Sequence, residues 1–484
     1  MSARYLMGID VGTQSAKVVI FRTDGEVLCS AQQPLRPLAI PQPNRAEHPD
    51  DDLWTSVQQA CRAAMARFYQ LGGQQHQLLA AGLCVIRCCR VLMRGDGELA
   101  WPVINWMDAR LNQAYQHEAA YGEVRWITTT SGYITHRLTG QTRDTSANYI
   151  GCWPMDDARQ DWDEAQMSAC NLRREQLFDV VRPGEALGNV TPAAAQACGL
   201  PDGLPIIATA HDKAVEALGA GALQSDEALI SLGTYIGAMV HGDETPRSSD
   251  HFWPFQAALP KRFLYECMGV RRGMWTISWF RDQFGAAAVK DAQDHGIDIE
   301  SLLSDEASRV PAGSDGLITL HDWAAPAQAP WRKGAIIGFD GRHTRAHLFR
   351  SLLEGIVFTM KNHMDPMMVA LDRPLAQLVI SGGGANSDLF MQLFADIFGV
   401  PARRNAMRSS AAIGCAISAG MAVGVWQDYR AAVAALVKTG ETFMPNAAHH
   451  AHYQQLNQQV YQQLHAALDP LLQRLSPLAE IPAR

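Results

Sequence analysis

The hydrophobic pattern at the start of the chain predicts two consecutive β-hairpins. Apolar and polar positions alternate from Leu6 to Phe21, interrupted at residues 11–14, where an outgoing strand gives way to a returning one. The Asp24-Gly25 pair that follows is a strong turn signal between two such strands. Residues 53–69 then carry apolar side chains at four-residue intervals, which indicates an amphipathic helix.

The same alternation of strands and helices continues along the chain. Short apolar runs predict strands at residues 80–85, 204–209, 228–232, 236–240 and 378–381. Helical patterns follow Asp212 and the cluster Gly382-Gly383-Gly384, and either Asn386 or Ser387 would cap the second helix. Strands and helices in alternation predict an α/β architecture.

Two segments share one short pattern. Residues 9–13 read Ile-Asp-Val-Gly-Thr and residues 230–234 read Ile-Ser-Leu-Gly-Thr. A five-residue match can arise by chance, but its place at the start of each half suggests a duplicated lobe. Gly219 and Gly221 mark the boundary, so we expect lobes at residues 1–222 and 223–484.

Length, composition and charge narrow the class of protein. The chain has 484 residues, which is more than a single hydrophobic core usually organises, so we expect two domains. The net charge is −8 and no long basic run occurs, which argues against nucleic acid or a membrane surface as partner. No apolar run resembles a signal peptide or a membrane helix, and the ten cysteines lack paired spacing. We therefore expect a cytoplasmic protein with reduced thiols.

The first hairpin has the composition of a phosphate site. Gly12 lets the backbone approach an anion, and successive turn amides can form a concave set of donors. Further donors or positive charge come from Thr13, Gln14, Ser15 and Lys17. Asp10 could hold Mg²⁺ through its water shell, since this ion takes few carboxylates. The alternative is an ordinary tight hairpin in which Asp10 stabilises the turn.

A second candidate is the triple glycine at residues 382–384. The absence of side chains leaves room for a base or ribose, and the N-terminus of the following helix offers amides and a positive dipole end to phosphate. The alternative is a flexible connection between a strand and a helix.

The third candidate is Asp212, which follows a predicted strand. Ligands of open α/β sheets bind at the ends of strands, and a carboxylate there can accept the proton of an attacking hydroxyl. The alternative is that Asp212 only caps the next helix, because Asp is a favoured N-cap residue.

Together these segments resemble the FGGY carbohydrate kinases, the family of glycerol kinase and xylulokinase in the actin-like superfamily. The resemblance covers about residues 5 to 430 and rests on motifs in the family's order. These are Met7–Ser15, Asn105–Arg110, Arg137–Gly140 with Asp144 and Ser146, Ser231–Thr234, Arg350–Gly355, and Ser381–Ser387 with the helix after it.

The resemblance implies two actin-like (ribonuclease H-like) lobes with ATP and a sugar in the cleft between them. It makes Asp212 the general base and Asp10 the Mg²⁺-linked carboxylate in the transfer of phosphate from ATP to a hydroxyl of a small sugar, ketose or polyol. The residues that it assigns to ATP are Gly12, Thr13, Gln14, Ser15, Lys17, Gly233, Thr234, Gly383, Gly384 and Asn386. The acceptor would lie near Asp212, Arg87, Trp106 and Asp108, and the family is often dimeric, which leaves a homodimer open.

Three departures from the family pattern concern the acceptor and turnover. The chain is shortened between Tyr121 and Thr129, a different tract stands at residues 321–326, and residues 409–414 lack the family's glutamate. They leave open the identity of the sugar. They also leave open a regulatory homologue that binds nucleotide or sugar without turnover. An actin-fold chaperone is disfavoured, because no peptide-binding domain follows the second lobe.

Overall fold

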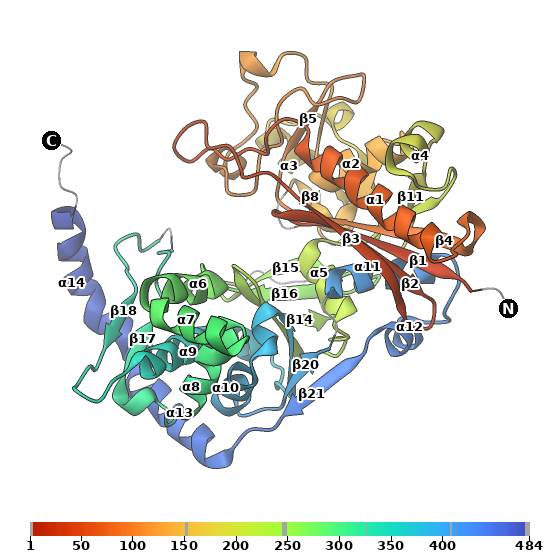
Figure 1. Ribbon diagram of the computed structural model, residues 1–484. Helices are drawn as coiled ribbons and strands as arrows, with labels where there is room; N and C mark the ends of the chain where they lie inside the picture. Colours follow the sequence, from red (N-terminus) through yellow and green to blue (C-terminus); the bar gives the residue numbers. More distant parts are fainter. Residues whose placement is uncertain (1–2, 151–152, 244–248, 327, 407–408, 480–484) are drawn as a thin grey trace.

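The computed structural model describes residues 3–150, 153–243, 249–326, 328–406 and 409–479. Two mixed β-sheets, each with helices on both faces, form the two halves of the molecule (Figure 1). The predicted α/β fold class is therefore confirmed.

The first sheet contains six strands within the described residues, in the order β11-β12-β4-β1-β2-β3. Their bounds are β1 Tyr5–Val11, β2 Ser15–Arg22, β3 Val27–Pro34, β4 Leu78–Val85, β11 Ala186–Asn189 and β12 Pro205–Ala208. Strands β1, β2 and β3 form the two predicted antiparallel hairpins, and β4 pairs in parallel with β1 and β12. The two hairpins are thus confirmed.

The second sheet contains seven strands within the described residues, in the order β15-β16-β14-β13-β19-β20-β21. Their bounds are β13 Glu227–Leu232, β14 Ile236–Gly242, β15 Phe252–Gln256, β16 Phe263–Cys267, β19 Gln377–Gly382, β20 Ala402–Asn405 and β21 Thr439–Phe443. Apart from the extra edge strand β15, this order repeats that of the first sheet. In each sheet a central hairpin is followed by two parallel strands and an antiparallel edge, as a duplicated lobe predicts.

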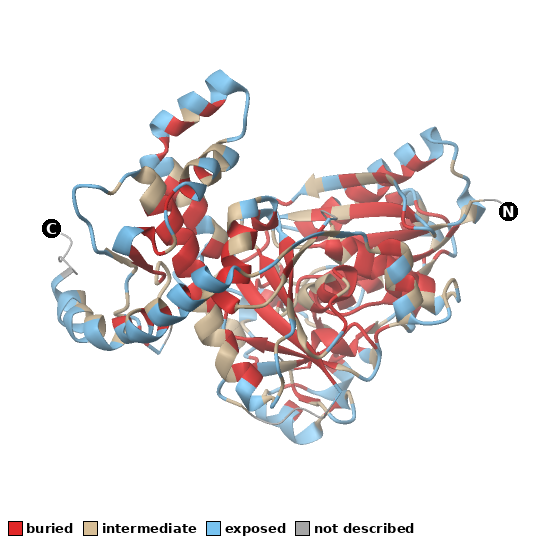
Figure 2. Cartoon of the chain, turned by 90° about the horizontal axis from the view of Figure 1, so that it is seen from below, coloured by how far each residue is buried: buried red, intermediate tan, exposed pale blue. Residues whose placement is uncertain are grey.

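Further helices pack around each sheet, and the last of them, at the C-terminal end, extends away from the second half (Figure 1). In the first half they are α1 Asp52–Gln70, α2 Thr130–Thr139, α3 Glu164–Ala169 and α4 Pro192–Cys198. In the second they are α6 Gly273–Phe284, α7 Ala286–His295, α8 Ile299–Ser308, α9 Arg345–Ala370, α10 Asp388–Phe398, α13 Ala447–Gln459 and α14 Leu464–Ala479. Figure 2 shows mostly buried strands and a mostly exposed α14. Among the described residues, no helix combines the length and apolarity that crossing a bilayer requires.

Four short strand pairs lie outside the two main sheets within the described residues, one of them formed by β8 Met155–Asp156 and β9 Asp161–Trp162. The other three join β5 Val91–Met93 to β6 Trp126–Thr128, β7 Arg143–Thr145 to β10 Asp179–Val181, and β17 Ile318–Leu320 to β18 Ala335–Ile337. The β5–β6 pair borders an accessory part of the first half, which has its own apolar cluster around Tyr115, Tyr149 and Trp162.

Two helices, α5 (Asp212–Gly219) and α11 (Ser410–Ala422), lie between the sheets (Figure 1). Each follows the equivalent strand of its half, β12 or β20, and together with α12 (Tyr429–Leu436) they form a core that both sheets share. Glycines bring the two backbones together. A Cβ on Gly219 would lie 1.7 Å from the carbonyl oxygen of Ser410, and one on Gly414 would lie 2.1 Å from that of Val215.

The close approach of α5 and α11 predicts that Gly414→Ala destabilises the protein. Alanine favours a helix over glycine by about 1 kcal/mol. The added methyl would meet the Val215 carbonyl, however, and relief requires the helices to separate, so we expect a net loss of roughly 2 kcal/mol or more. Urea unfolding measures the change. Gly341→Ala is the control, because a Cβ there meets no atom within 4 Å. Equal unfolding midpoints for the two variants would contradict the packing argument.

Candidate active site

The sequence-predicted catalytic and metal residues meet between the sheets. Asp10 lies near the end of β1 and Asp212 at the first residue of α5. The negative charges of Asp212 and of Glu216, one turn further along α5, both act on Asp10. The fold thus brings together carboxylates that are about two hundred positions apart in the sequence.

The first hairpin is a tight turn held by its own backbone. The Gly12 amide donates to the Ser15 carbonyl at 3.0 Å, and the Gln14 carbonyl accepts from the Leu35 amide at 2.9 Å. The indole of Trp106 donates to the Thr13 hydroxyl at 3.3 Å. Lys17, opposite Asp10 in the β1–β2 register, donates to the Ser409 hydroxyl at the start of α11. The turn is therefore tied to two other segments of the chain.

Asp212 is not the cap of its helix. The N-cap residue of α5 is His211, whose Nδ1 accepts from the Ala214 amide at 3.4 Å, and Asp212 is the first helical residue. Its Oδ1 is buried and accepts no hydrogen bond from any residue that the structure describes. The capping alternative is therefore wrong, and this oxygen is available as an acceptor.

Burial and, after it, the repulsion between carboxylates set the electrostatics of the site. Burial, followed by the charges of Asp212 and Glu216, raises the pKa of Asp10 to about 7, although Lys17 and Lys213 oppose the shift. The carboxylate is thus poorly compensated by the protein alone. A bound cation would relieve this repulsion, so the donor set fits a divalent metal.

Hydrogen bonds tie α5 to the second sheet. Lys213 donates to the Ser231 hydroxyl at 2.6 Å and pairs with Glu216 at 3.2 Å, while Ser231 donates to Glu216 at 2.8 Å. Ser231 occupies the position in β13 that Asp10 occupies in β1. The structural duplication thus brings the two equivalent strands to one charge cluster.

The second hairpin and the triple glycine are neighbours. Gly382 has a φ of 97°, and a Cβ there would lie 2.4 Å from the Leu232 carbonyl oxygen. A Cβ on Gly384 would lie 2.8 Å from the Leu232 side chain, so packing already explains this glycine. Gly383 differs, because a Cβ there meets no atom within 4 Å. The predicted opening for a nucleotide thus centres on Gly383.

The remaining predicted ATP residues lie on the same two turns. Gly233 and Thr234 form the turn between β13 and β14, and Thr234 is exposed. Asn386 is also exposed, at the end of the short helix Gly383–Asn386. Ser387, and not Asn386, caps α10 by accepting from the Phe390 amide at 3.2 Å.

Arg87 lies after β4 and reaches the other half of the molecule. Its Nη2 lies 2.5 Å from Oε2 of the buried Glu266 in β16, and its guanidinium stacks over the Phe255 ring at 4.1 Å. Cys88, the next residue, has a φ of 59°, which is rare for a residue with a side chain. A strained residue beside an arginine that crosses between the sheets is consistent with a ligand site.

The other two predicted acceptor residues have different environments. Trp106 is about half exposed (48%) and faces Thr13 of the hairpin turn. Asp108 is buried. Its carboxylate accepts from the Ala46 amide at 2.8 Å and from the Arg110 amide at 2.9 Å, and it pairs with the Arg110 side chain. Trp106 is thus placed to contact a ligand, whereas Asp108 fixes the fold of its own loop.

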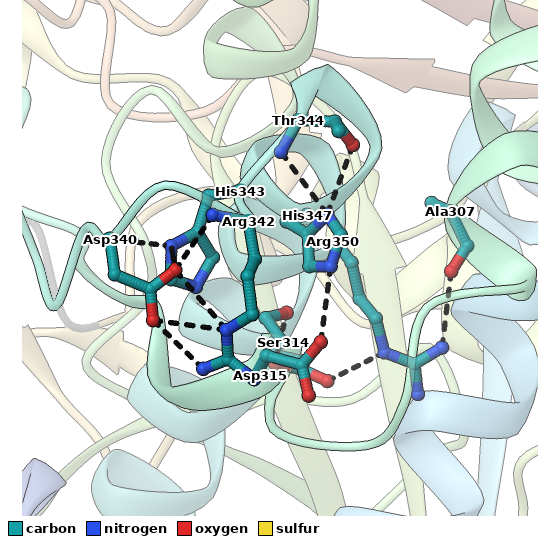
Figure 3. A network of polar contacts seen from close by, with 10 residues as sticks. Ala307, Ser314, Asp315, Asp340, Arg342, His343, Thr344, His347 and Arg350 are labelled. Atoms are coloured by element: carbon teal, nitrogen blue, oxygen red, sulfur yellow. Dashed lines mark hydrogen bonds and ion pairs between the residues drawn. The ribbon is translucent and has the colours of Figure 1, made fainter.

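The Arg350–Gly355 motif lies in helix α9, within a separate polar network (Figure 3). Arg350 donates to the Ala307 carbonyl at 3.3 Å and pairs with Glu354 at 2.8 Å. At the N-terminal end of α9, Arg342 pairs with Asp340 at 2.8 Å. The motif therefore holds α9 to α8 and to the turn before β17, and it contributes to the fold of the second half.

Several groups at the site were not identified from the sequence. Glu216 follows Asp212 by four residues, so a helical projection would have placed both carboxylates on one face. Glu266 and Phe255 carry no local signal, because their relation to Arg87 exists only in the folded chain. Within the described ranges, no group of three or more His, Cys, Asp or Glu residues is placed to hold a metal ion. Mg²⁺ needs no such group, since one or two carboxylates, phosphates and water suffice.

Comparison with known proteins identifies the family. The N-terminal domain model of the FGGY family of carbohydrate kinases matches residues 5–122 and 113–219, and its C-terminal domain model matches residues 228–423. A protein named uncharacterized sugar kinase YgcE, from Escherichia coli (strain K12), is 42% identical over 476 residues, which cover 98% of this chain and 96% of that protein.

Solved structures of the same family share the fold. Gluconate kinase from Lactobacillus acidophilus superposes with a TM-score of 0.85 at 20% identity, over 98% of this chain and 100% of that one. Xylulose kinase from Rhodospirillum rubrum gives a TM-score of 0.83 at 24% identity, over 97% and 100%. The predicted two-lobe actin-like architecture is confirmed. The chain belongs to the FGGY family of carbohydrate kinases, and it is a carbohydrate kinase.

Proposed function

We propose that this kinase transfers the γ-phosphoryl group of Mg²⁺-bound ATP to a hydroxyl of a small sugar, ketose or polyol, with Asp212 as general base. Family membership supports sugar phosphorylation in general. The observation that carries the finer proposal is the position of Asp212, at the start of α5, with a buried carboxylate oxygen that accepts no hydrogen bond within the described chain.

The proposed chemistry needs one proton acceptor. As the acceptor hydroxyl oxygen forms its bond to the γ-phosphorus, the bond between that phosphorus and the ADP oxygen breaks, and the hydroxyl proton passes to Asp212. Lys213 stays paired with Glu216 and Ser231 and so holds the first turn of α5 in place. The base is therefore positioned by neighbours that do not react.

The nucleotide half of the proposal uses the two hairpin turns and the triple glycine. The phosphates would lie at residues 12–15 with Lys17 and at Gly233 and Thr234, and the adenosine at Gly383, Gly384 and Asn386. Asp10 would hold the metal, whose charge offsets that of the phosphates when it is bound. The uncompensated charge of Asp10 beside Asp212 supports this assignment.

The proposed binding site for the sugar acceptor is a surface to which both sheets contribute. Arg87, held by Glu266, and the exposed ring of Trp106 would meet the sugar, while Asp108 would act by shaping the loop that carries Trp106. The charge on Arg87 is offset by Glu266, which favours a neutral polyol face at this point. A substrate panel should still include sugar acids, because one structural relative is a gluconate kinase.

Asp212→Asn should abolish most turnover while the protein still folds and binds ATP. Asparagine keeps the shape of the side chain but cannot accept the proton, and loss of a general base typically costs about 10²–10⁴-fold in rate. A coupled assay of ADP release over pentoses, hexoses, ketoses, polyols and sugar acids measures turnover, and calorimetry measures ATP binding. Asp202→Asn, on an exposed turn, is the control. Full activity in Asp212→Asn would show that the assigned base is wrong.

Gly383→Val should raise the KM for ATP at least tenfold and leave unfolding unchanged. The space into which the valine would project is empty of protein atoms, so the fold tolerates it, but the proposed nucleotide would meet it. Steady-state kinetics with ATP varied at saturating sugar test this. Gly95→Val is the control, since its Cβ also meets nothing. An unchanged KM for ATP would show that Gly383 does not belong to the nucleotide site.

Asp10→Asn should stabilise the metal-free protein at pH 8. The pKa of Asp10 is raised from 3.8 to about 7 in the folded state, so ionisation above pH 7 costs folding free energy. The gain should shrink as the pH falls below 7 and vanish below 3.8, where the carboxyl is protonated in both the folded and the unfolded state. Thermal unfolding in EDTA should show an increase of a few degrees at pH 8.

The same variant should lose activity that depends on Mg²⁺. Asp24→Asn, at an exposed turn, is the control, and it should show neither effect. A metal-free Asp10→Asn protein less stable than the wild type at pH 8 would contradict the assigned repulsion.

A further inference from the structure

A polar cavity lies in the accessory part of the first half, apart from the proposed ATP and sugar residues. Its volume is about 130 Å³, which would hold roughly four waters at ~30 Å³ each. It is lined by Arg45, Arg90, Ile104, Arg110, Gln113, Ala114, Tyr115, Gln116, Glu118 and Tyr121. The exposed side chains of Gln113 and Gln116 leave it open to solvent. None of the lining residues belongs to the catalytic, metal, ATP or acceptor sets.

Two of the three arginines in the wall are neutralised by carboxylates. Arg45 makes a bidentate ion pair with Glu118, in which its Nη1 and Nη2 lie 3.1 and 3.0 Å from the carboxylate oxygens. Arg110 pairs with Glu47 at 2.6 Å and with Asp108 at 2.7 Å. Their charges are therefore largely offset within the protein.

Arg90 has no such partner. Its backbone is fixed by paired hydrogen bonds with Ile104, both 3.0 Å long. Its Nε is buried without a hydrogen-bond partner, and its guanidinium makes no ion pair with any residue in the described part of the chain. Its neighbours are the rings of Tyr115 and Trp153, whose centroids lie 5.7 and 5.9 Å from Cζ. Burial lowers the pKa of Arg90, as expected when no carboxylate stabilises the charge.

The partly buried guanidinium of Arg90 has no carboxylate beside it, and its Nε has no hydrogen-bond acceptor among the described residues. Desolvation of a charged group costs several kcal/mol unless hydrogen bonds and an opposite charge replace the lost water. The two aromatic rings lie near the 6 Å limit of a cation–π contact, so they offset only part of this desolvation free energy. An anion in the cavity would supply both the charge and the acceptors.

We propose that this cavity is a binding site for a phosphate group, with Arg90 as its principal ligand. The planar guanidinium of arginine can donate two hydrogen bonds to one phosphate, which the ammonium of lysine does less well. The cavity has the size of such a group with a few waters, and the amides of Gln113 and Gln116 stand at its mouth. The phosphate is either free or the end group of a phosphorylated metabolite whose remainder faces solvent.

Binding of inorganic phosphate and of a sugar phosphate to the full-length protein tests the proposal. Calorimetry at constant ionic strength, with saturating Mg-ADP to block the nucleotide site, should show saturable binding to the wild type. Arg90→Gln should weaken it at least tenfold, and Arg94→Gln, which alters an exposed arginine four residues on, should not. No saturable binding to the wild type, or equal affinity in Arg90→Gln, would overturn the proposal.

Thermal unfolding separates a ligand role from a structural one. Without phosphate, Arg90→Gln should unfold at the same temperature as the wild type or higher, because an uncompensated buried charge is removed. Added phosphate should stabilise the wild type only. A lower unfolding temperature in the absence of phosphate would make Arg90 a packing residue and overturn the proposal. Tighter binding of the sugar phosphate than of inorganic phosphate would support a metabolite as source, and the reverse would support the free ion.

Discussion

The contact between helices α5 and α11 is the constraint on which the rest of the structure depends. The two backbones approach so closely that Gly219 and Gly414 leave no space for a Cβ. Each helix starts beside the charge cluster, α5 at Asp212 and α11 next to Ser409, the hydrogen-bond partner of Lys17. Because both helix starts are fixed by one contact, the proposed base and the proposed phosphate hairpin are held in a defined relation.

The same contact restricts how the two halves can move. The apolar core around α5, α11 and α12 takes residues from both sheets, so the halves cannot part there without exposing it to water. A movement that keeps this core buried would therefore be a rotation of the halves about these helices. The Arg87–Glu266 pair also joins the halves, and one of its partners is still partly exposed. If the acceptor binds at this wall as proposed, it has to displace or accommodate that pair, and the pair would then contribute to selection among sugars.

The fold could be predicted from the sequence, and the proposed nucleotide residues could be located on their turns, because these signals are local. The Asp-Val-Gly-Thr turn, its counterpart at residues 231–234 and the triple glycine each lie within one short segment. The hairpins and the α/β class are as predicted, and the division at residue 222 stays a prediction. The cap of α5 was the local exception, since a histidine holds a position that aspartate more often takes.

The acceptor half could not be predicted in the same way, because its contacts join distant segments. Arg87 meets Glu266, and Ser146 donates to Gln256 at 2.6 Å across the two halves. No periodicity or motif encodes such pairs. They arise only when the duplicated sheets close on the helices between them. Arg90 makes the same point, because a sequence gives no sign that the fold will partly bury this arginine without a carboxylate beside it. What this kinase binds beyond ATP is thus determined by tertiary placement, and residues near the lobe interface should decide its substrate.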